Sequence, residues 1–417
     1  MPQRRIRRFA ASIITAAALI FSLSASAKPD ELVIATTLSP EATAHIISSW
    51  QQQPGAVRIR TINRTSAALE RLLDTPALED VDLVVTSSPM LLQHLQEHDR
   101  LAELPDLPDV SRRLVPLRLR GNAAAVAFSG YGILVNKRRM AESNLPVPAS
   151  WDSLTDSRYQ GLLLMSSPSR SDTYHLMVES LLQQRGWDEG WALLLNVSGN
   201  LATISSRSFG VADKSSRAGR AAPVIDNYAW LLLGDPELAF NYLPDSATSP
   251  TFVAISRHSL NKEKARAFIR FLLSEQGQNV LADSSTGKYP VTPLPQGNPR
   301  EPVQRRLLNS PHQMDENLVL KRQRMVQQLF DTAITFRLTE SIDAWRALYT
   351  AEARVKHPLP HIRALLTAMP VSVQESTDPA YYSRFDDNRK AEEEYIRWQK
   401  FFREQQRKAI AELEKVR

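Results

Sequence analysis

The chain contains no cysteine among its 417 residues. Disulfide bonds, thiolate nucleophiles and cysteine-ligated metal sites are therefore excluded. A chain of this length can bury enough apolar surface to fold without such crosslinks, and it is long enough for two domains and a further segment. Its stability must accordingly come from its own hydrophobic core.

Long hydrophobic runs are also missing. The apolar stretch from Ile13 to Leu23 is shorter than the roughly 20 residues that span a bilayer, and no later stretch supplies a span. Four arginines precede it and Ala25-Ser26-Ala27 follows, which is the pattern of a secretory signal peptide. We therefore expect cleavage after Ala27 and a soluble exported protein. Arg7-Arg8 lacks the spacing typical of twin-arginine export signals.

Charge of one sign is not concentrated anywhere after the leader. The leader has four arginines and no acidic residue, so its removal lowers the formal net charge from +6 to about +2. In the remaining chain, most lysines and arginines lie in stretches that also carry acidic residues. We therefore expect no nucleic-acid partner.

Catalytic signatures are equally scarce. The sequence has no Gly-x-Ser-x-Gly elbow, metal-spaced histidine pair or nucleotide-binding glycine loop. A hydrolase would need a base beside its nucleophile, and His175 follows Asp172-Thr173 closely enough to be considered. On a helix, such a histidine is more typical of packing or of the surface. We therefore predict that the protein is not an enzyme and needs no metal or cofactor.

Three strand-then-helix units open the mature chain. Residues 31–35, 57–62 and 81–85 have strand-like patterns and each precedes a helical pattern, which favours a mainly parallel sheet. Ligands of such sheets bind beyond the carboxyl ends of the strands. Hydroxyl residues follow each strand, and the second junction adds an arginine. The candidate ligand-binding residues are Thr36, Thr37, Arg64, Ser66, Ser87 and Ser88.

Similar polar turns recur in the middle of the chain. The strand-like residues 161–165 lead into hydroxyls around one arginine, just before a predicted helix from Tyr174. The N–H groups at a helix start can bind an anion, although these hydroxyls could simply cap the helix. Residues 204–210 and 223–230 repeat the pattern. The candidates here are Ser167, Ser169, Arg170, Ser171, Thr173, Ser206, Arg207, Ser208, Asp226 and Tyr228.

Two glycines mark the expected passage between two lobes. Gly130 and Gly132 interrupt the strand pattern of residues 123–135, so the backbone is expected to bend there. The charged segment from Phe385 favours a solvated surface helix over a partner-docking helix. The predicted organisation is a signal peptide at 1–27, a first lobe at 28–128 plus about 251–310, a second lobe at 129–250 and a helical extension at 311–417.

Four motifs, taken in order, resemble one class of proteins. They are residues 151–161, the Ser-Pro-Ser-x-Ser-x-Thr turn at 167–173, Gly190-Trp191 and the Ser-Glu-Gln-Gly-Gln sequence at 274–278. Together they resemble the ferric-iron and sugar-phosphate class of periplasmic solute-binding proteins, over roughly residues 32–293. Within that class, residues 169–173, 204–213 and 318–366 look most like the phosphoglycerate transport regulatory family of enteric bacteria.

This resemblance implies a two-lobed α/β fold of the type II periplasmic-binding-protein kind, with a C-terminal helical extension. It implies that two lobes joined by a two-strand hinge close on an anion. It also implies signalling of that ligand to a membrane sensor kinase that controls phosphoglycerate transport. The alternative is a substrate-delivery subunit that docks on an ABC permease and carries sugar phosphate or ferric iron.

The ferric binders of this class carry Asn-Tyr-Tyr-Trp, whose two phenolates hold the metal. The corresponding residues here are Asn227-Tyr228-Ala229-Trp230, so one hard oxygen ligand is missing. Tyr381-Tyr382 lies outside the matched region. The resemblance therefore disfavours iron, and turns rich in serine and arginine favour a small phosphorylated acid. Phosphoglycerates, phosphoenolpyruvate and sugar phosphates all remain open as ligands.

Overall fold

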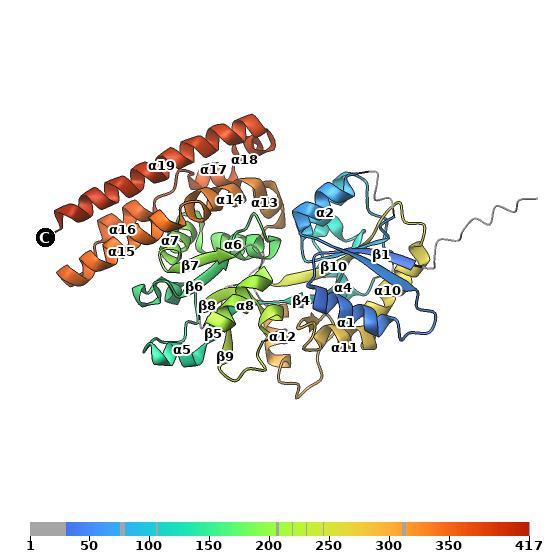
Figure 1. The fold of residues 1–417 in the computed structure, drawn as a ribbon. Coiled ribbons are helices and arrows are strands. Elements are labelled where there is room, and N and C mark those ends of the chain that lie inside the picture. Colours follow the sequence, from blue (N-terminus) through green and yellow to red (C-terminus); the bar gives the residue numbers. More distant parts are fainter. Residues whose placement is uncertain are drawn as a thin grey trace, which may run out of the picture.

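The computed structural model describes residues 31–75, 80–105, 107–205, 208–218, 220–230, 232–244, 246–310 and 314–416. The predicted signal peptide and two predicted site residues, Ser206 and Arg207, lie outside the described residues. Within the described ranges, no helix is both long enough and apolar enough to cross a bilayer. Two β-sheets lie side by side, and a helical C-terminal segment covers the second one (Figure 1).

The first lobe is built on a six-stranded sheet in the order β11-β4-β10-β3-β1-β2. β1 pairs in parallel with β2 and β3, whereas β10 runs antiparallel to β3 and β4, and β11 antiparallel to β4. The three strands on which the parallel prediction was based are thus parallel, and the antiparallel strands β10 and β11 join the sheet after the chain has returned from the second lobe. The strands are β1 (Glu31–Thr36), β2 (Arg58–Asn63), β3 (Leu83–Thr86), β4 (Ala123–Ser129), β10 (Ser249–Ile255) and β11 (Tyr289–Pro290).

Helices cover both faces of this first sheet. Alternate residues of β1 face opposite sides: Leu32 and Ile34 belong to one buried cluster, and Val33 and Ala35 belong to another. Both faces are therefore apolar. The helices are α1 (Pro40–Trp50), α2 (Ser66–Leu73), α3 (Pro89–Glu97), α4 (Asp109–Arg112), the short η2 (Leu117–Leu119), α10 (Lys262–Leu273), α11 (Glu275–Ala282) and α12 (Glu301–Leu308).

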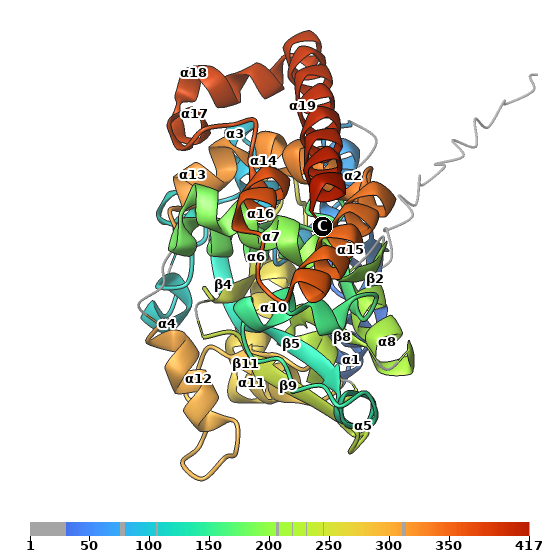
Figure 2. The same cartoon turned by 90° about the vertical axis from the view of Figure 1, so that its left-hand side faces the viewer.

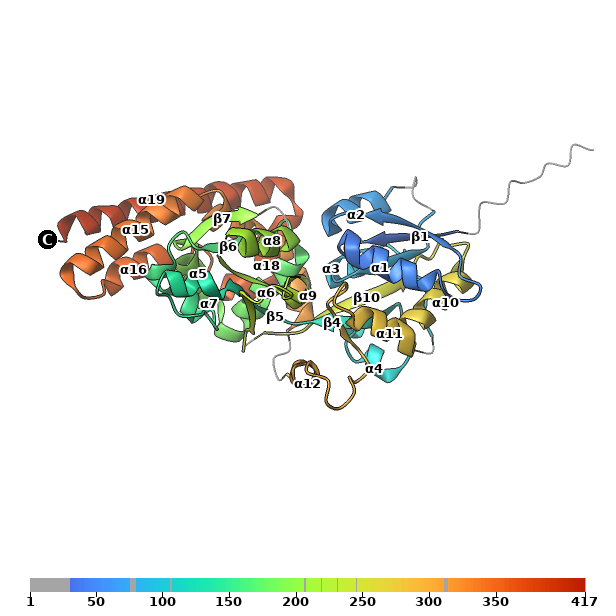
Figure 3. The same ribbon diagram turned by 60° about the horizontal axis from the view of Figure 1, so that its bottom comes forward.

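The second lobe is built on a five-stranded sheet in the order β7-β6-β8-β5-β9. Its strands are β5 (Tyr131–Asn136), β6 (Leu163–Ser166), β7 (Leu201–Ser205), β8 (Ala221–Ile225) and β9 (Leu238–Tyr242). Its helices are α5 (Lys137–Glu142), η3 (Asp152–Thr155), η4 (Ser157–Tyr159), α6 (Asp172–Arg185), α7 (Trp187–Ser198), α8 (Ser208–Ala218) and α9 (Asp226–Trp230). Figure 3 shows this lobe beside the first, with β4 and β5 passing between them.

The chain passes from one sheet to the other at Gly130, between β4 and β5, and returns between β9 and β10. A Cβ atom at Gly130 would lie 2.9 Å from side-chain atoms of Leu307 and Tyr242. At Gly132 it would lie 2.5 Å from the backbone oxygen of Asn241. Both positions therefore need glycine because other chain segments pack directly against the backbone.

The C-terminal extension packs onto the second lobe, where α14 contacts α6 and α15, α16 and α17 contact α7 (Figures 1 and 2). It begins with α13 (Glu316–Lys321), α14 (Gln323–Phe330) and η5, a π-helical turn (Asp331–Thr335). It continues with α15 (Leu338–Val355), α16 (Pro360–Thr367), α17 (Val373–Thr377), α18 (Pro379–Tyr382), the short η6 (Ser383–Asp386) and α19 (Asn388–Lys415).

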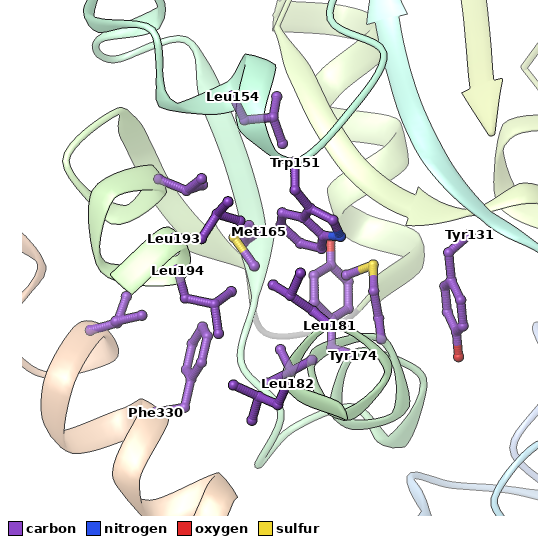
Figure 4. Packing of buried hydrophobic residues seen from close by; sticks show 14 of the residues in the cluster. Tyr131, Trp151, Leu154, Met165, Tyr174, Leu181, Leu182, Leu193, Leu194 and Phe330 are labelled. Carbon is purple, nitrogen blue, oxygen red and sulfur yellow. The ribbon is translucent and has the colours of Figure 1, made fainter. Parts of the chain in front are cut away.

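The extension and the second lobe share one hydrophobic core. Phe330 of α14 lies among Leu182 of α6 and Leu194 of α7 (Figure 4), and all three side chains are buried. Trp398 and Phe402 of α19 belong to the same cluster. The extension is therefore an integral part of this lobe, and α19 is an amphipathic helix with one buried face.

Candidate functional site

A cavity of about 390 Å³ lies between the two lobes. On the first lobe its wall follows the carboxyl ends of β1, β2 and β3, where the sequence predicted a ligand. On the second lobe it is formed by the turn before α6 and by α8 and α9. The lining residues are Thr37, Leu38, Ser39, Ala42, Asn63, Arg64, Thr65, Ser66, Ala67, Arg71, Ser87, Ser88, Ser169, Arg170, Ser171, Asp172, Thr173, Ser208, Phe209, Ile225, Asn227, Tyr228 and Lys288.

Local hydrogen bonds hold the hydroxyl groups of the first wall. Ser88 caps α3 by accepting from the N–H of Leu91 at 3.0 Å. The hydroxyl of Thr37 lies 2.9 Å from that of Thr86. Ser87 lies 3.2 Å from the hydroxyl of Thr251. All of these partners belong to the first lobe, so the sheet and its own helices position this wall.

The second wall is centred on the turn that begins α6. Ser171 is the N-cap of this helix and accepts from the N–H of Tyr174 at 3.4 Å. Asp172 and Thr173 occupy the first turn, and both line the cavity. The N-terminus of a 14-residue helix therefore faces the space between the lobes, where its unpaired N–H groups favour an anion.

A carboxylate from the extension holds the same turn. Asp331 Oδ1 accepts a hydrogen bond from Ser167 Oγ at 2.6 Å, and Oδ2 accepts one from Ser169 Oγ at 2.5 Å. Asp331 and Ser167 are buried, whereas Ser169 lines the cavity. The wall of the second lobe thus includes a partner from a segment about 160 residues downstream.

Of the described residues that line the cavity, four are basic and one is acidic: Arg64, Arg71, Arg170, Lys288 and Asp172. Among the described residues, none of these four cations has a carboxylate partner. Lys288 is only 2% exposed. Burial lowers its pKa from 10.5 to about 8, and the charge of Asp226 opposes this shift. The cavity is therefore electropositive and contains one buried ammonium group that makes no direct ion pair with a carboxylate of the described residues.

A second cavity, of about 840 Å³, lies beside the hinge and has a different charge balance. Among the described residues that line it, three arginines are matched by three carboxylates. They are Arg113, Arg120, Arg305, Glu301, Asp315 and Glu316. Leucine and proline side chains make up much of the remaining surface. The smaller cavity is therefore the better candidate for an anion.

The structure brings most of the predicted site residues to the cavity. Those that line it are Thr37, Arg64, Ser66, Ser87, Ser88, Ser169, Arg170, Ser171, Thr173, Ser208 and Tyr228. Ser206 and Arg207 lie outside the described residues.

Three predicted residues, Thr36, Ser167 and Asp226, do not line the cavity. The hydroxyl of Thr36 accepts from the N–H group of Leu38 inside the first lobe. Ser167 is buried against Asp331. Both were chosen because hydroxyls gather at strand ends, but the hydroxyls of these two residues serve the backbone or a carboxylate behind the wall.

Asp226 lies at the hinge rather than on the cavity wall. Its Oδ2 accepts from the N–H of Gly130 at 2.8 Å and from the hydroxyl of Tyr242 at 3.1 Å. Tyr242 in turn lies 2.8 Å from the hydroxyl of Tyr289. Burial raises the pKa of Asp226 to about 6. This carboxyl group therefore hydrogen-bonds to the backbone at the crossing point and, through Tyr242, is linked to Tyr289 of the first lobe.

Lys288 is the most informative lining residue that the sequence analysis missed. It follows Gly287, whose φ of +70° turns the chain just before β11. The sequence feature that could have identified it is a hydroxyl-rich turn, Ser284-Ser285-Thr286, followed by glycine and lysine. The rest of this stretch has the pattern of a loop. Other lining residues that were not proposed include Ser39, Asn63, Thr65, Arg71, Asp172, Phe209 and Asn227.

Two alternative sites, a ferric-iron site at Tyr228 and a hydrolase site at His175, can be compared with this geometry. Tyr228 lines the cavity, but Ala229 is fully buried and offers no oxygen ligand. His175 is also fully buried, on α6, near Glu179 and Arg322. Burial lowers the pKa of His175, so its ring is held neutral inside the lobe.

The chain is similar to a known protein family and to named relatives. The family model described as bacterial extracellular solute-binding protein matches residues 79–310. The phosphoglycerate transport regulatory protein PgtC of Salmonella typhimurium is 58% identical over 395 residues, covering 94% of this chain and 99% of that protein. PgtC of Salmonella typhi matches with the same values.

Solved structures share the fold at low sequence identity. AfuA from Actinobacillus pleuropneumoniae, with fructose-6-phosphate bound, is 17% identical with a TM-score of 0.55, covering 63% of this chain and 85% of that chain. Iron-bound HitA from Pseudomonas aeruginosa is 19% identical with a TM-score of 0.55, covering 65% and 89%. A substrate-binding protein of an ABC transporter from Agrobacterium tumefaciens is 16% identical with a TM-score of 0.59, covering 77% and 96%. The predicted two-lobed periplasmic-binding-protein fold is thus confirmed.

Proposed function

The chain belongs to the bacterial extracellular solute-binding proteins, and we propose that its ligand is a small phosphorylated acid such as a phosphoglycerate. The protein would bind this ligand in the periplasm and signal it to a membrane sensor that controls phosphoglycerate transport. It would act by binding and closure, without turnover of the ligand. The name of its Salmonella relatives supports the ligand class and the regulatory role.

The observation that carries this proposal is the charge of the cavity. Lys288 is buried without a carboxylate partner among the described residues, and Arg64, Arg71 and Arg170 lie around the same space. A buried cation costs several kcal/mol of desolvation unless an anion compensates it. A ligand with a phosphate and a carboxylate would supply that compensation and could be held by forked arginine donors.

The position of the cavity supports capture by closure. First-lobe groups such as Arg64 face second-lobe groups such as Arg170 across the cavity, so an anion between them would contact both lobes. The two lobes are joined at Gly130 and between β9 and β10, and this arrangement permits hinge motion. Binding of an anion would therefore draw the walls together.

Iron delivery is a weaker alternative for this cavity. Fe³⁺ needs hard anionic oxygen ligands, and Tyr228 supplies one phenol where Ala229 supplies none. Four cations around the cavity would also repel a metal ion. Delivery of a sugar phosphate to an ABC permease fits the same charges, so it must be separated from sensing by experiment.

Titration calorimetry of residues 28–417 tests the ligand class. We expect 2-phosphoglycerate, 3-phosphoglycerate or phosphoenolpyruvate to bind more tightly than glycerate, inorganic phosphate or fructose 6-phosphate. Lys288→Met and Arg170→Ala should each weaken binding at least about tenfold, because a hydrogen bond to a charged group contributes roughly 1.5–3 kcal/mol. Arg346→Ala, an exposed arginine paired with Asp343 on α15, is the matched control.

The proposal fails if no phosphorylated acid binds, or if ferric ion binds and these anions do not. Sensing and delivery can be separated in cells that express a phosphoglycerate transporter constitutively. Loss of binding through Lys288→Met should then abolish induction by external phosphoglycerate but leave its uptake unchanged. Loss of uptake in that strain would instead support the delivery role.

A further inference from the structure

Ser169 is in contact with two parts of the protein that otherwise lie apart. Its side chain lines the cavity, and its hydroxyl also donates to Asp331 of the extension at 2.5 Å. A serine hydroxyl has one proton to donate. While that proton points to Asp331, Ser169 cannot donate to a phosphate or carboxylate in the cavity.

Asp331 has two serine donors but sits on a segment outside the cavity wall. Ser167 donates to its other oxygen at 2.6 Å, and the two serine hydroxyls lie 2.8 Å apart. Asp331 is the first residue of the π-helical turn that follows α14. Such wide turns interrupt the regular hydrogen-bond ladder of a helix and recur at functional positions. Ser169 is therefore hydrogen-bonded directly to a non-standard turn of the extension.

The same part of the extension is anchored to α6, the helix that begins at this turn. Arg322 donates to both oxygens of Glu179, at 3.0 Å from Nε and 2.7 Å from Nη2, and both residues are buried. Phe330 packs against Leu182 and Leu194 (Figure 4). The segment from Arg322 to Asp331 thus contacts α6 near its middle and the turn that precedes it.

We propose that Asp331 is a positioning residue that couples the cavity to the extension, by competing with a bound anion for the hydroxyl proton of Ser169. An anion that takes this proton leaves Asp331 with Ser167 as its remaining serine donor. The turn at residues 331–335 and helix α14 then respond to occupancy. The inference rests on the proposed function, because it requires an anion in the cavity.

Coupling of this kind is reciprocal. If a bound anion weakens the contact between Ser169 and Asp331, that contact must weaken anion binding by the same factor. Asp331→Asn keeps the shape of the side chain and removes its charge. We therefore expect Asp331→Asn to bind 3-phosphoglycerate, or whichever phosphorylated acid the calorimetric screen identifies, roughly five- to tenfold more tightly.

The experiment combines calorimetry with hydrogen-exchange mass spectrometry on residues 28–417. In the wild-type protein, the phosphorylated acid should change amide exchange in peptides that cover residues 323–337. In Asp331→Asn that response should disappear although binding persists. Asp343→Asn, an exposed carboxylate on α15 that pairs with Arg346, is the matched control and should change neither measurement.

A second variant protects the test against misfolding. Ser169→Ala removes the contested proton from an exposed position of the turn, so the core is untouched. It should bind the anion more weakly and should also lose the exchange response of residues 323–337. Retention of that response in Ser169→Ala, or unchanged affinity and response in Asp331→Asn, would overturn the inference and leave the ligand assignment intact. Absence of binding in the wild-type protein would instead overturn the proposed function and this inference with it.

Discussion

The two walls of the cavity are built from similar residues but are held in different ways. On the first lobe, Ser88 caps its own helix and Thr37 pairs with a threonine of the neighbouring strand. On the second lobe, Ser167 and Ser169 are held by Asp331, from a helical segment that follows both lobes in the chain. One wall is therefore self-contained, and the other depends on the extension.

This difference has a consequence for signalling. A wall fixed by its own sheet moves with its lobe as a rigid body, so it can close on a ligand but report nothing beyond closure. A wall that shares a hydroxyl with another segment can change that segment's contacts when a ligand arrives. The second lobe also shares its core with the extension, which gives the segment a rigid support. The regulatory role proposed above is thus expected to reside in the second lobe.

The largest expected effect comes from breaking the buried ion pair that joins the second lobe to the extension. Arg322→Ala leaves the carboxylate of Glu179 buried without its cation, which should lower the free energy of unfolding by about 3–5 kcal/mol. Urea denaturation followed by circular dichroism measures this loss.

The matched change in the first lobe is Arg60→Ala. Arg60 pairs with Glu31 at 3.3 Å, and its side chain is 47% exposed, so the loss should be at most about 1 kcal/mol. Similar losses for Arg322→Ala and Arg60→Ala would show that the second lobe does not depend on the extension.

The second comparison is between two buried carboxyl groups, Asp226 of the second lobe and Asp82 of the first. Asp226 keeps a pKa of about 6 in the folded protein, against 3.8 unperturbed, and its Oδ1 has no partner among the described residues. Because the folded-state pKa is raised, its contribution to stability is present below about pH 4 and is lost as the pH rises through about 6. Asp226→Asn should remove this loss, which amounts to about 3 kcal/mol for two pKa units.

Asp82 of the first lobe is the counterpart. It accepts from the N–H of Val33, the hydroxyl of Ser259 and the amide of Asn261. Asp82→Asn should therefore lower stability at pH 7 by about 1–3 kcal/mol, whereas Asp226→Asn should raise it. Unfolding curves from pH 4 to pH 8 test the expected loss of stability in Asp82→Asn and the expected gain in Asp226→Asn. A change of stability in the same direction in both variants would contradict the difference assigned to these two carboxyl groups.

Much of the fold and of the first wall could be predicted from the sequence, because both depend on local patterns. Short apolar runs place most strands of the first lobe, and the capping serine Ser88 lies two residues after β3. The contact of Ser169 with Asp331 could not be predicted, since 162 residues separate them and helical spacing does not show which residue of a helix meets a distant turn. Lys288 was missed because it precedes a two-residue strand, which is too short to leave a periodic pattern.

The position of Asp226 was mispredicted for a related reason. A carboxylate at the junction of β8 and α9 has the sequence signature of a ligand-binding group. Its actual partners, Gly130 and Tyr242, come from two other strands that cross at the hinge. Local sequence identifies a junction as polar, but only the tertiary arrangement decides whether its side chain faces the cavity or the hinge.

The smallest expected effect comes from two of the helix caps that line the cavity, Ser88 and Ser171. Ser88 accepts from Leu91 N–H at 3.0 Å, and Ser171 accepts from Tyr174 N–H at the longer distance of 3.4 Å. Without ligand, Ser88→Ala should cost about 1 kcal/mol, and Ser171→Ala about 0.5 kcal/mol. The reason is that Asp331 also holds the turn before α6 through Ser169, whereas the start of α3 has no such contact with the extension among the described residues.

This comparison can be sharpened with a double-mutant cycle on urea unfolding. In the Asp331→Asn background, the cost of Ser171→Ala should rise towards that of Ser88→Ala, because the turn then depends more on its own cap. The cost of Ser88→Ala should be the same in both backgrounds, since α3 shares no hydrogen bond with the extension among the described residues. Additive behaviour at Ser171 would mean that the second wall holds itself in place, and the two walls would then be equivalent.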